Sequence, residues 1–222
     1  MKFIHTADIH LGAEPDAGSS YTAKRPEELW NSFERLLNIC EEEQTDLLLI
    51  AGDLFHRQPL LRELKELDYL FSRLTHTQVV LMAGNHDYLK SMSYYRNYKW
   101  QGPVHMFLSQ KPACMEFKEL GVRIYGLSYE EREITEPLYE KILPEKRGIA
   151  SILLAHGGGN VFQQCADIGA LGARYIQRIL ILCRASAVGD AVNFNGARLA
   201  LHGHALTGQL IQRLTVQLDG RV

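Results

Sequence analysis

Short hydrophobic runs alternate with helical patterns over the first half of the chain, and each run stops abruptly at polar residues. Runs at residues 2–9, 46–51 and 78–83 predict strands. Residues 26–43 and 59–75 carry apolar side chains at helical spacing, which predicts two helices. This strand–helix–strand–helix–strand order is typical of a parallel sheet covered by helices. Such sheets bind ligands at the carboxyl ends of their strands, so the polar residues there are the first candidates for function.

The second half of the chain has shorter and less regular patterns. Hydrophobic runs predict strands at residues 104–108, 113–117, 122–127 and 149–155. A turn is expected at residues 118–121 and a short helix at residues 134–143. Residues 176–183 are apolar enough for a strand or a helix, and periodicity does not decide between them.

Composition narrows the class of protein without naming a partner. The 222 residues are 46% hydrophobic and 23% charged, with a net charge of -2, so no global charge points to nucleic acid or a membrane. The four cysteines show no metal-binding spacing, which favours reduced thiols. We find no signal-peptide pattern and no apolar run long enough to span a bilayer, and we expect a cytoplasmic protein without membrane contact.

Polar residues capable of binding a metal follow several of the predicted strands. They are Asp8, His10, Asp53, Asn85 and His156. Carboxylate, imidazole and amide oxygen ligands without thiolate suit Mn²⁺, Fe²⁺ or Zn²⁺. A carboxylate between two such clusters can bridge two ions, and a two-ion site can polarise a phosphoryl oxygen. Caps and turns at strand ends are the alternative explanation for these five residues.

Four short blocks resemble, in order, the signature blocks of calcineurin-like binuclear metallophosphoesterases. The blocks are Asp8-Ile9-His10, Gly52-Asp53-Leu54-Phe55, Gly84-Asn85-His86-Asp87 and His156-Gly157-Gly158. The residues in and around these blocks are most similar to those of SbcD-type DNA repair nucleases. The resemblance covers roughly residues 1–160 and implies an α/β fold, a two-layered β-sandwich flanked by helices. We therefore expect a metallophosphoesterase core over residues 1–160, with residues 161–222 completing it and holding a short or degenerate capping region.

The resemblance also implies roles for individual residues. Asp8 and His10 would hold the first metal ion, and Asp53 would bridge both ions. Asn85 and His156 would hold the second ion. The resemblance therefore implies two divalent metal ions as cofactors, and we expect them to be Mn²⁺.

The resemblance assigns catalytic roles to two further residues. His86 would contact the scissile phosphate or protonate the leaving oxygen, and Asp87 would orient the His86 ring. The implied activity is phosphodiester hydrolysis on DNA, as an exo- or endonuclease in repair. We also expect an SbcC-like ATPase as a partner and a homodimer as the assembly.

One block departs from the family pattern. The family closes its site with Gly-His-x-His, but the corresponding stretch here reads Ala170-Leu171-Gly172-Ala173-Arg174-Tyr175, without either histidine. His202 and His204 have the right two-residue spacing later in the chain. Either this pair replaces the missing ligands, or each ion lacks one ligand and activity is impaired.

Two other functions share these features and stay open. The metal core would also serve a phosphatase or phosphodiesterase acting on a nucleotide or phosphoprotein, and a chain without its last block could be a non-catalytic binding module. The Tyr-rich stretch 94–100 either stacks bases or packs against the fold. We expect no functional role for four other histidines, His5, His56, His76 and His105.

Overall fold

The computed structural model describes residues 1–14, 18, 23–142 and 150–157, and the backbone of four later strands. The helices are α1 (Arg25–Glu42) and α2 (Leu61–Ser72), with the 3₁₀ turns η1 (Tyr94–Arg96), η2 (Lys118–Leu120) and η3 (Leu138–Lys141). The strands are β1 (Lys2–Thr6), β2 (Leu47–Ala51), β3 (Gln78–Met82), β4 (Val104–Met106), β5 (Ala113–Phe117), β6 (Val122–Gly126), β7 (Ala150–Ala155), β8 (Ile179–Cys183), β9 (Val192–Asn193), β10 (Arg198–Leu206) and β11 (Gln209–Gln217).

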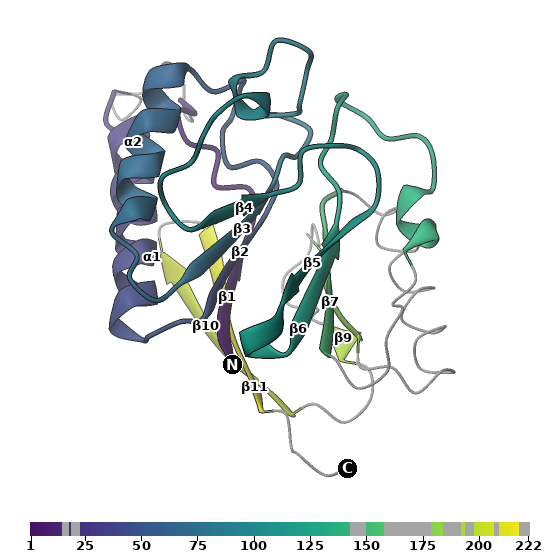
Figure 1. The fold of residues 1–222 in the computed structure, drawn as a ribbon. Coiled ribbons are helices and arrows are strands. Elements are labelled where there is room, and N and C mark those ends of the chain that lie inside the picture. Colours follow the sequence, from purple (N-terminus) through teal and green to yellow (C-terminus); the bar gives the residue numbers. More distant parts are fainter. Residues whose placement is uncertain are drawn as a thin grey trace.

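The first sheet has six strands in the order β10-β11-β1-β2-β3-β4. Strands β1 to β4 run parallel, whereas β11 pairs antiparallel with both β1 and β10. Helices α1 and α2 lie side by side along the outer face of this sheet (Figure 1). The predicted parallel sheet with its two covering helices is therefore present.

The second sheet has five strands in the order β5-β6-β7-β8-β9. Strands β6, β7 and β8 are parallel, and β5 and β9 close the two edges antiparallel. The two sheets form the two layers of a sandwich (Figure 1). The predicted two-layered α/β sandwich is confirmed, and in the described part of the chain both α-helices cover the first sheet.

Strand β2 shows why the sequence builds this arrangement. All five of its residues are buried. Leu48 and Ile50 pack toward the helices, while Leu47, Leu49 and Ala51 pack toward the second sheet. A strand that is buried on both faces needs a continuous apolar run, because successive side chains point to opposite faces. The pattern of β2 therefore places it at the centre of the molecule.

In the second half, the four predicted strands are present as β4, β5, β6 and β7, one prediction is wrong, and one open question is resolved. The helix expected at residues 134–143 is only the short 3₁₀ turn η3. The ambiguous segment 176–183 contains strand β8. Parts of residues 161–222 extend both sheets, but the division into two regions stays a prediction. The stretch 170–175, where the family's histidines are missing, lies outside the described residues.

Membrane contact was not expected from the sequence. No helix within the described ranges combines the length and the apolar character needed to cross a bilayer.

Candidate metal centre

The loops after β1 and β2 have an unusual backbone at the predicted metal ligands. Asp8, His10 and Asp53 have positive φ angles of 55°, 52° and 52°. Side chains rarely adopt this left-handed region, and such strain concentrates at functional sites. The amide of Asp8 donates to the Gly52 carbonyl at 3.2 Å, and the amide of His10 donates to the Asp53 carbonyl at 3.0 Å. These backbone bonds hold the two loops side by side.

Asp8, His10 and Asp53 form one cluster of potential ligands. His10 Nε2 lies 3.7 Å from Asp8 Oδ1 and 3.9 Å from Asp53 Oδ2. Each of the three residues offers a ligand atom within 4.8 Å of the others. The structure therefore brings together the three residues that the sequence assigned to the first ion and the bridge.

Asp53, Asn85 and His156 form a second cluster that shares the Asp53 carboxylate. His156 Nε2 lies 2.9 Å from Asn85 Oδ1 and 3.5 Å from Asp53 Oδ2. The other ring nitrogen, Nδ1, donates to the Ala51 carbonyl at 2.8 Å. In a neutral ring this bond leaves Nε2 as an acceptor that faces two oxygen acceptors. Such a convergence of lone pairs requires a proton or a cation.

The charges in this cluster shift one another's pKa. Burial alone would raise the pKa of Asp53, but His156, the amide of His86 and His10 together hold it below the usual value. Burial would likewise lower the pKa of His156, but the Asp53 and Asp8 carboxylates and the Ala51 carbonyl raise it. The favoured state is thus an anionic Asp53 next to a positive charge.

Two glycines allow the loops to approach this closely. A β-carbon at Gly52 would lie 2.6 Å from His156 Nδ1, and Gly52 has a φ of +82°. A β-carbon at Gly84 would collide with Asp53 Oδ1. Any side chain at these positions would displace a candidate ligand, which explains why glycine precedes Asp53 and Asn85.

The structure changes the role expected for Asp87. Its carboxylate accepts hydrogen bonds from the amides of Gly84 at 2.8 Å and Phe55 at 3.2 Å. The His86 ring is instead oriented by the His56 carbonyl, which lies 3.1 Å from His86 Nδ1. Asp87 therefore ties two ligand-bearing loops together, and it does not hold the His86 ring directly. The sequence could not show this contact, because every residue has a backbone carbonyl and nothing in the sequence marks the one that binds His86.

Buried tyrosines to which the sequence analysis gave no role in metal binding support the centre. Tyr95 donates its hydroxyl to Asp87 at 3.1 Å. Tyr129 donates to the His156 carbonyl at 2.7 Å, and the Tyr139 hydroxyl accepts from the His156 amide at 3.2 Å. Buried hydroxyls require such partners. No sequence spacing connects these residues, because the contacts span separate elements.

His56 lies in the centre although no role was expected for it. Its ring centroid is 5.0 Å from that of His86 and 5.3 Å from that of His10. The three histidines also form a group with mutually close ligand atoms. His5, for which no role was expected either, is buried within β1.

The Tyr-rich stretch mostly packs against the fold. Tyr95 is fully buried, and Tyr98 and Trp100 pack against the core under the helices. Tyr94 is half exposed, at 50%. The packing alternative therefore holds for three of the four aromatic side chains, and base stacking by this stretch would rest on Tyr94 alone.

His202 and His204 lie on strand β10. The residue between them, Gly203, pairs with Gln212, which in turn pairs with His5 of β1. Two interstrand spacings therefore separate the Gly203 and His5 backbones, which is roughly 9 to 10 Å. Their use as replacement ligands stays a prediction.

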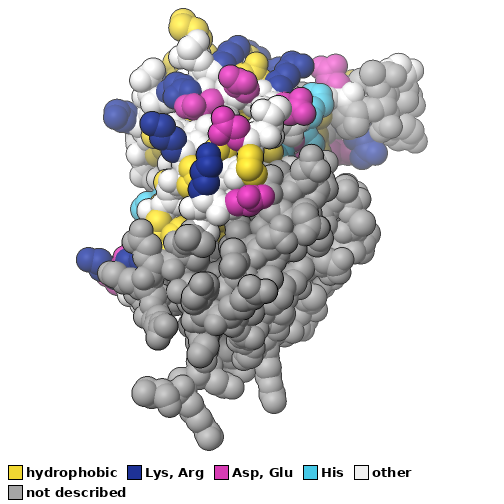
Figure 2. Space-filling model, turned by 90° about the vertical axis from the view of Figure 1, so that its right-hand side faces the viewer, with side chains coloured by type: hydrophobic (Ala, Val, Ile, Leu, Met, Phe, Trp, Pro, Cys, Tyr) yellow, Lys and Arg dark blue, Asp and Glu magenta, His cyan; other side chains and the backbone are white. Residues whose placement is uncertain are grey.

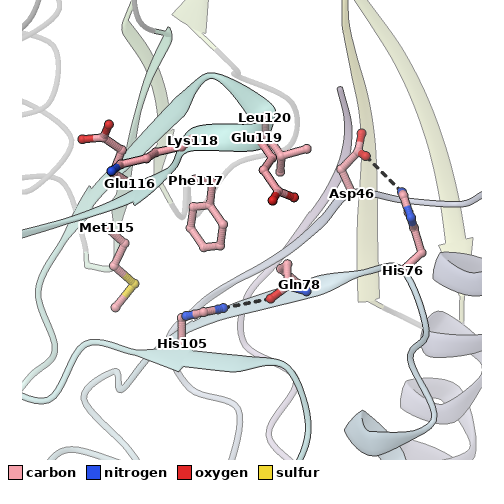
Figure 3. Close-up of a pocket in the computed structure, with 10 residues that line it drawn as sticks. All are labelled: Asp46, His76, Gln78, His105, Met115, Glu116, Phe117, Lys118, Glu119 and Leu120. Atoms are coloured by element: carbon pink, nitrogen blue, oxygen red, sulfur yellow. Dashed lines mark hydrogen bonds and ion pairs between the residues drawn. The ribbon is translucent and has the colours of Figure 1, made fainter.

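A cavity of about 710 Å³ lies at the end of the sandwich opposite to the candidate metal ligands. Figure 3 shows its lining, with His76 bound to Asp46 and His105 bound to Gln78. Among the described residues, no three metal-binding side chains come together there. In Figure 2, His side chains lie beside Asp and Glu side chains at the surface, and Lys and Arg side chains are interspersed with acidic ones. The chemistry thus concentrates at the ends of β1, β2, β3 and β7.

The described residues fit divalent metal ions. Asp53 is fully buried, and its Oδ2 has no hydrogen-bond partner among the described residues. Atoms that share one ion at about 2.1 Å lie roughly 3 to 3.5 Å apart. The distances in the second cluster and from Asp53 to His10, which run from 2.9 to 3.9 Å, are close to this range. Two such clusters sharing one carboxylate, at the strand ends of an α/β sandwich, define the class of binuclear metal-dependent hydrolases.

The chain belongs to the calcineurin-like phosphoesterase family, whose profile matches residues 1–207. Members of this family use divalent metal ions. The family assignment agrees with the resemblance found in the four sequence blocks.

Individual relatives point to one branch of this family. An uncharacterized metallophosphoesterase, YhaO of Bacillus subtilis, is 34% identical over 149 residues, which are 61% of this chain and 35% of that protein. The DNA double-strand break repair protein Mre11 of Aeropyrum pernix is 36% identical over 89 residues, 39% of this chain and 21% of that protein. The chain thus spans about a third of the length of the first relative and about a fifth of the second.

Proposed function

We propose that this chain hydrolyses phosphodiester bonds in DNA with two divalent metal ions, expected to be Mn²⁺. The observation that carries the proposal is the buried Asp53 carboxylate between His10 and His156. Asp8 and His10 would hold one ion, and Asn85 and His156 the other, with Asp53 shared. When bound, the ions supply Lewis acidity that polarises the phosphate and activates water.

His86 is suited to act on the phosphate. Its Nδ1 donates to the His56 carbonyl at 3.1 Å, so its Nε2 is the nitrogen that remains for the substrate. The His86 ring lies 4.8 Å from the ring of His10, and its amide donates to Asp53 Oδ1 at 2.9 Å. These contacts tie the position of His86 to that of the bridging carboxylate. A protonated His86 can therefore neutralise charge on the phosphate or give a proton to the leaving oxygen.

DNA is favoured as the substrate because the relatives that this chain matches over part of its length include DNA double-strand break repair proteins. The proposal extends to an SbcC-like ATPase partner, a homodimer and a cytoplasmic location, which the SbcD-type resemblance implies. A nucleotide or phosphoprotein phosphatase would use the same centre, and no described contact favours it over DNA.

Metal binding and hydrolysis test the proposal together. Calorimetric titration with Mn²⁺ should give two ions per chain, and the loaded protein should cleave bis-p-nitrophenyl phosphate and duplex DNA. Asp53→Asn should lower both activities at least about 100-fold and weaken metal binding. Glu119→Gln, at the far cavity, is the matched carboxylate-to-amide control and should change neither.

The outcomes separate the candidate functions. A folded chain that binds two ions but cleaves only small nucleotides would favour the phosphatase alternative. A folded chain that binds one ion or none and cleaves nothing would favour the non-catalytic binding module and refute the proposal.

A further inference from the structure

The far cavity, of about 710 Å³, lies at the amino ends of β2 and β3 (Figure 3). Asp46 precedes β2, and Gln78 is the first residue of β3. The candidate metal ligands follow the carboxyl ends of the same strands, so the five residues of β2 separate the two sites by roughly 16 Å. A ligand in the far cavity would therefore not touch the metal centre. The volume lies within the roughly 300–1,000 Å³ of pockets that enclose a whole small molecule.

One part of the far cavity is apolar and carries an aromatic ring. Met115 and Phe117 come from strand β5, and Leu120 comes from the turn η2. All three side chains are partly buried and pack against the core between the sheets. The Phe117 ring meets the His105 ring edge to face, with ring centroids 5.0 Å apart. This part of the cavity suits the apolar body of a ligand, and an aromatic ring fits it well.

Two carboxylates line the cavity, and they differ in their contacts. Asp46 is engaged, because its Oδ2 accepts from the Lys2 amide at 2.6 Å and its Oδ1 lies 3.0 Å from His76 Nε2. Glu119 is exposed, and its carboxylate forms no hydrogen bond or ion pair with another described residue. Figure 3 shows the Glu119 side chain projecting into the cavity beside Phe117. Glu119 is therefore the carboxylate that remains for a ligand.

The basic side chains of the lining leave this part of the cavity without a positive charge. His105 donates its Nε2 proton to Gln78 Oε1 at 2.9 Å, and burial lowers the pKa of His105, so its ring is neutral at pH 7. Figure 3 shows the Lys118 side chain extending toward the Glu116 side of the hairpin, away from Gln78 and His105. A cation bound beside Phe117 would therefore meet a carboxylate and no competing charge.

We propose that the far cavity binds a small arylalkylamine, with its ammonium group on Glu119 and its ring against Phe117, Met115 and Leu120. Primary alkylamines are protonated at pH 7, as lysine is. An ammonium group between a carboxylate and an aromatic ring is attracted by the negative charge and by the negative face of the ring. A carboxylate ligand of the same shape would be repelled by Glu119. This site is separate from phosphodiester hydrolysis and does not rest on the proposed function.

Three small probes test the two parts of the site. Phenethylamine has both the ring and the ammonium group, 3-phenylpropionate replaces the ammonium group by a carboxylate, and propylamine lacks the ring. Calorimetric titration of the full chain in EDTA should show phenethylamine binding about tenfold or more tightly than either of the other probes. Because no metal ion is present, the measurement does not depend on turnover.

Substitutions at Glu119 locate the ammonium group. Glu119→Gln should weaken phenethylamine binding about tenfold, because the amide keeps the shape of the side chain and loses its charge. Glu119→Lys should invert the preference, so that 3-phenylpropionate binds more tightly than phenethylamine. Both variants should fold, since Glu119 is exposed in a turn. Glu66→Lys makes the same charge change at an exposed position of helix α2 and should leave both affinities unchanged.

The outcomes decide this inference separately from the proposed function. If the wild-type chain binds phenethylamine no more tightly than 3-phenylpropionate and propylamine, the site is refuted. A preference for phenethylamine that Glu119→Lys leaves intact also refutes it, because the amine then binds elsewhere. A chain that binds phenethylamine as expected but cleaves no phosphodiester would refute the proposed function and support the amine site.

Discussion

The buried His5 should make an acid-sensitive contribution to the stability of this protein, which one substitution isolates. His5 is 7% exposed, and by strand alternation it lies on the same face of β1 as Phe3, toward the second sheet. Burial lowers the pKa of His5 from 6.5 to about 4. The unfolded chain therefore takes up a proton near pH 6.5, whereas the folded chain resists it until about pH 4.

The sign and size of the effect follow from proton linkage. The stability from neutral His5 is fully present above pH 6.5 and is lost as the pH falls toward 4. At 1.36 kcal/mol per pKa unit, the loss is roughly 3 kcal/mol. Asp87 opposes it, because burial raises its pKa from 3.8 to about 6, so stability rises as that carboxylate is protonated. The two contributions nearly cancel in the wild-type chain.

Urea unfolding from pH 7 to 4 in the presence of EDTA can isolate the His5 contribution. His5→Leu should become more stable relative to wild type as the pH falls, with a difference that grows by about 3 kcal/mol. The same substitution at the exposed His76 serves as the control and should show no comparable growth. A wild-type and a His5→Leu profile that stay parallel over this range would refute the reasoning.

Two further predictions concern the support of the centre. Gly84→Ala should weaken Mn²⁺ binding about tenfold or more, because its β-carbon would collide with Asp53 Oδ1. Gly121→Ala also strains the backbone, since Gly121 has a φ of +63°, but its β-carbon would meet nothing within 4 Å, so the titrated Mn²⁺ affinity should stay unchanged. Tyr95→Phe should lower the free energy of unfolding by about 1 to 2 kcal/mol, because Asp87 loses one of its three hydrogen-bond donors; equal denaturant midpoints for the variant and the wild type would contradict this role.

Much of the fold was predictable because the decisive signals are local. The continuous apolar run of β2 and the helical spacing of α1 and α2 predicted their elements to within a few residues. The expected helix at residues 134–143 failed because its apolar spacing reflects packing of Leu138, Tyr139 and Ile142 against the second sheet. Periodicity reports burial, and burial alone does not distinguish a helix from a packed turn.

The sequence by itself determined which side chains could bind metal and that they follow strands. Asp8, Asp53 and Asn85 stand after apolar runs, and a parallel sheet brings the ends of such runs to one edge. Only the tertiary structure decided what holds them there. Asp87 binds two loop amides, the His56 carbonyl orients His86, and the hydroxyls of buried tyrosines support the centre. These contacts join residues distant in sequence through backbone groups, and backbone groups are the same in every sequence.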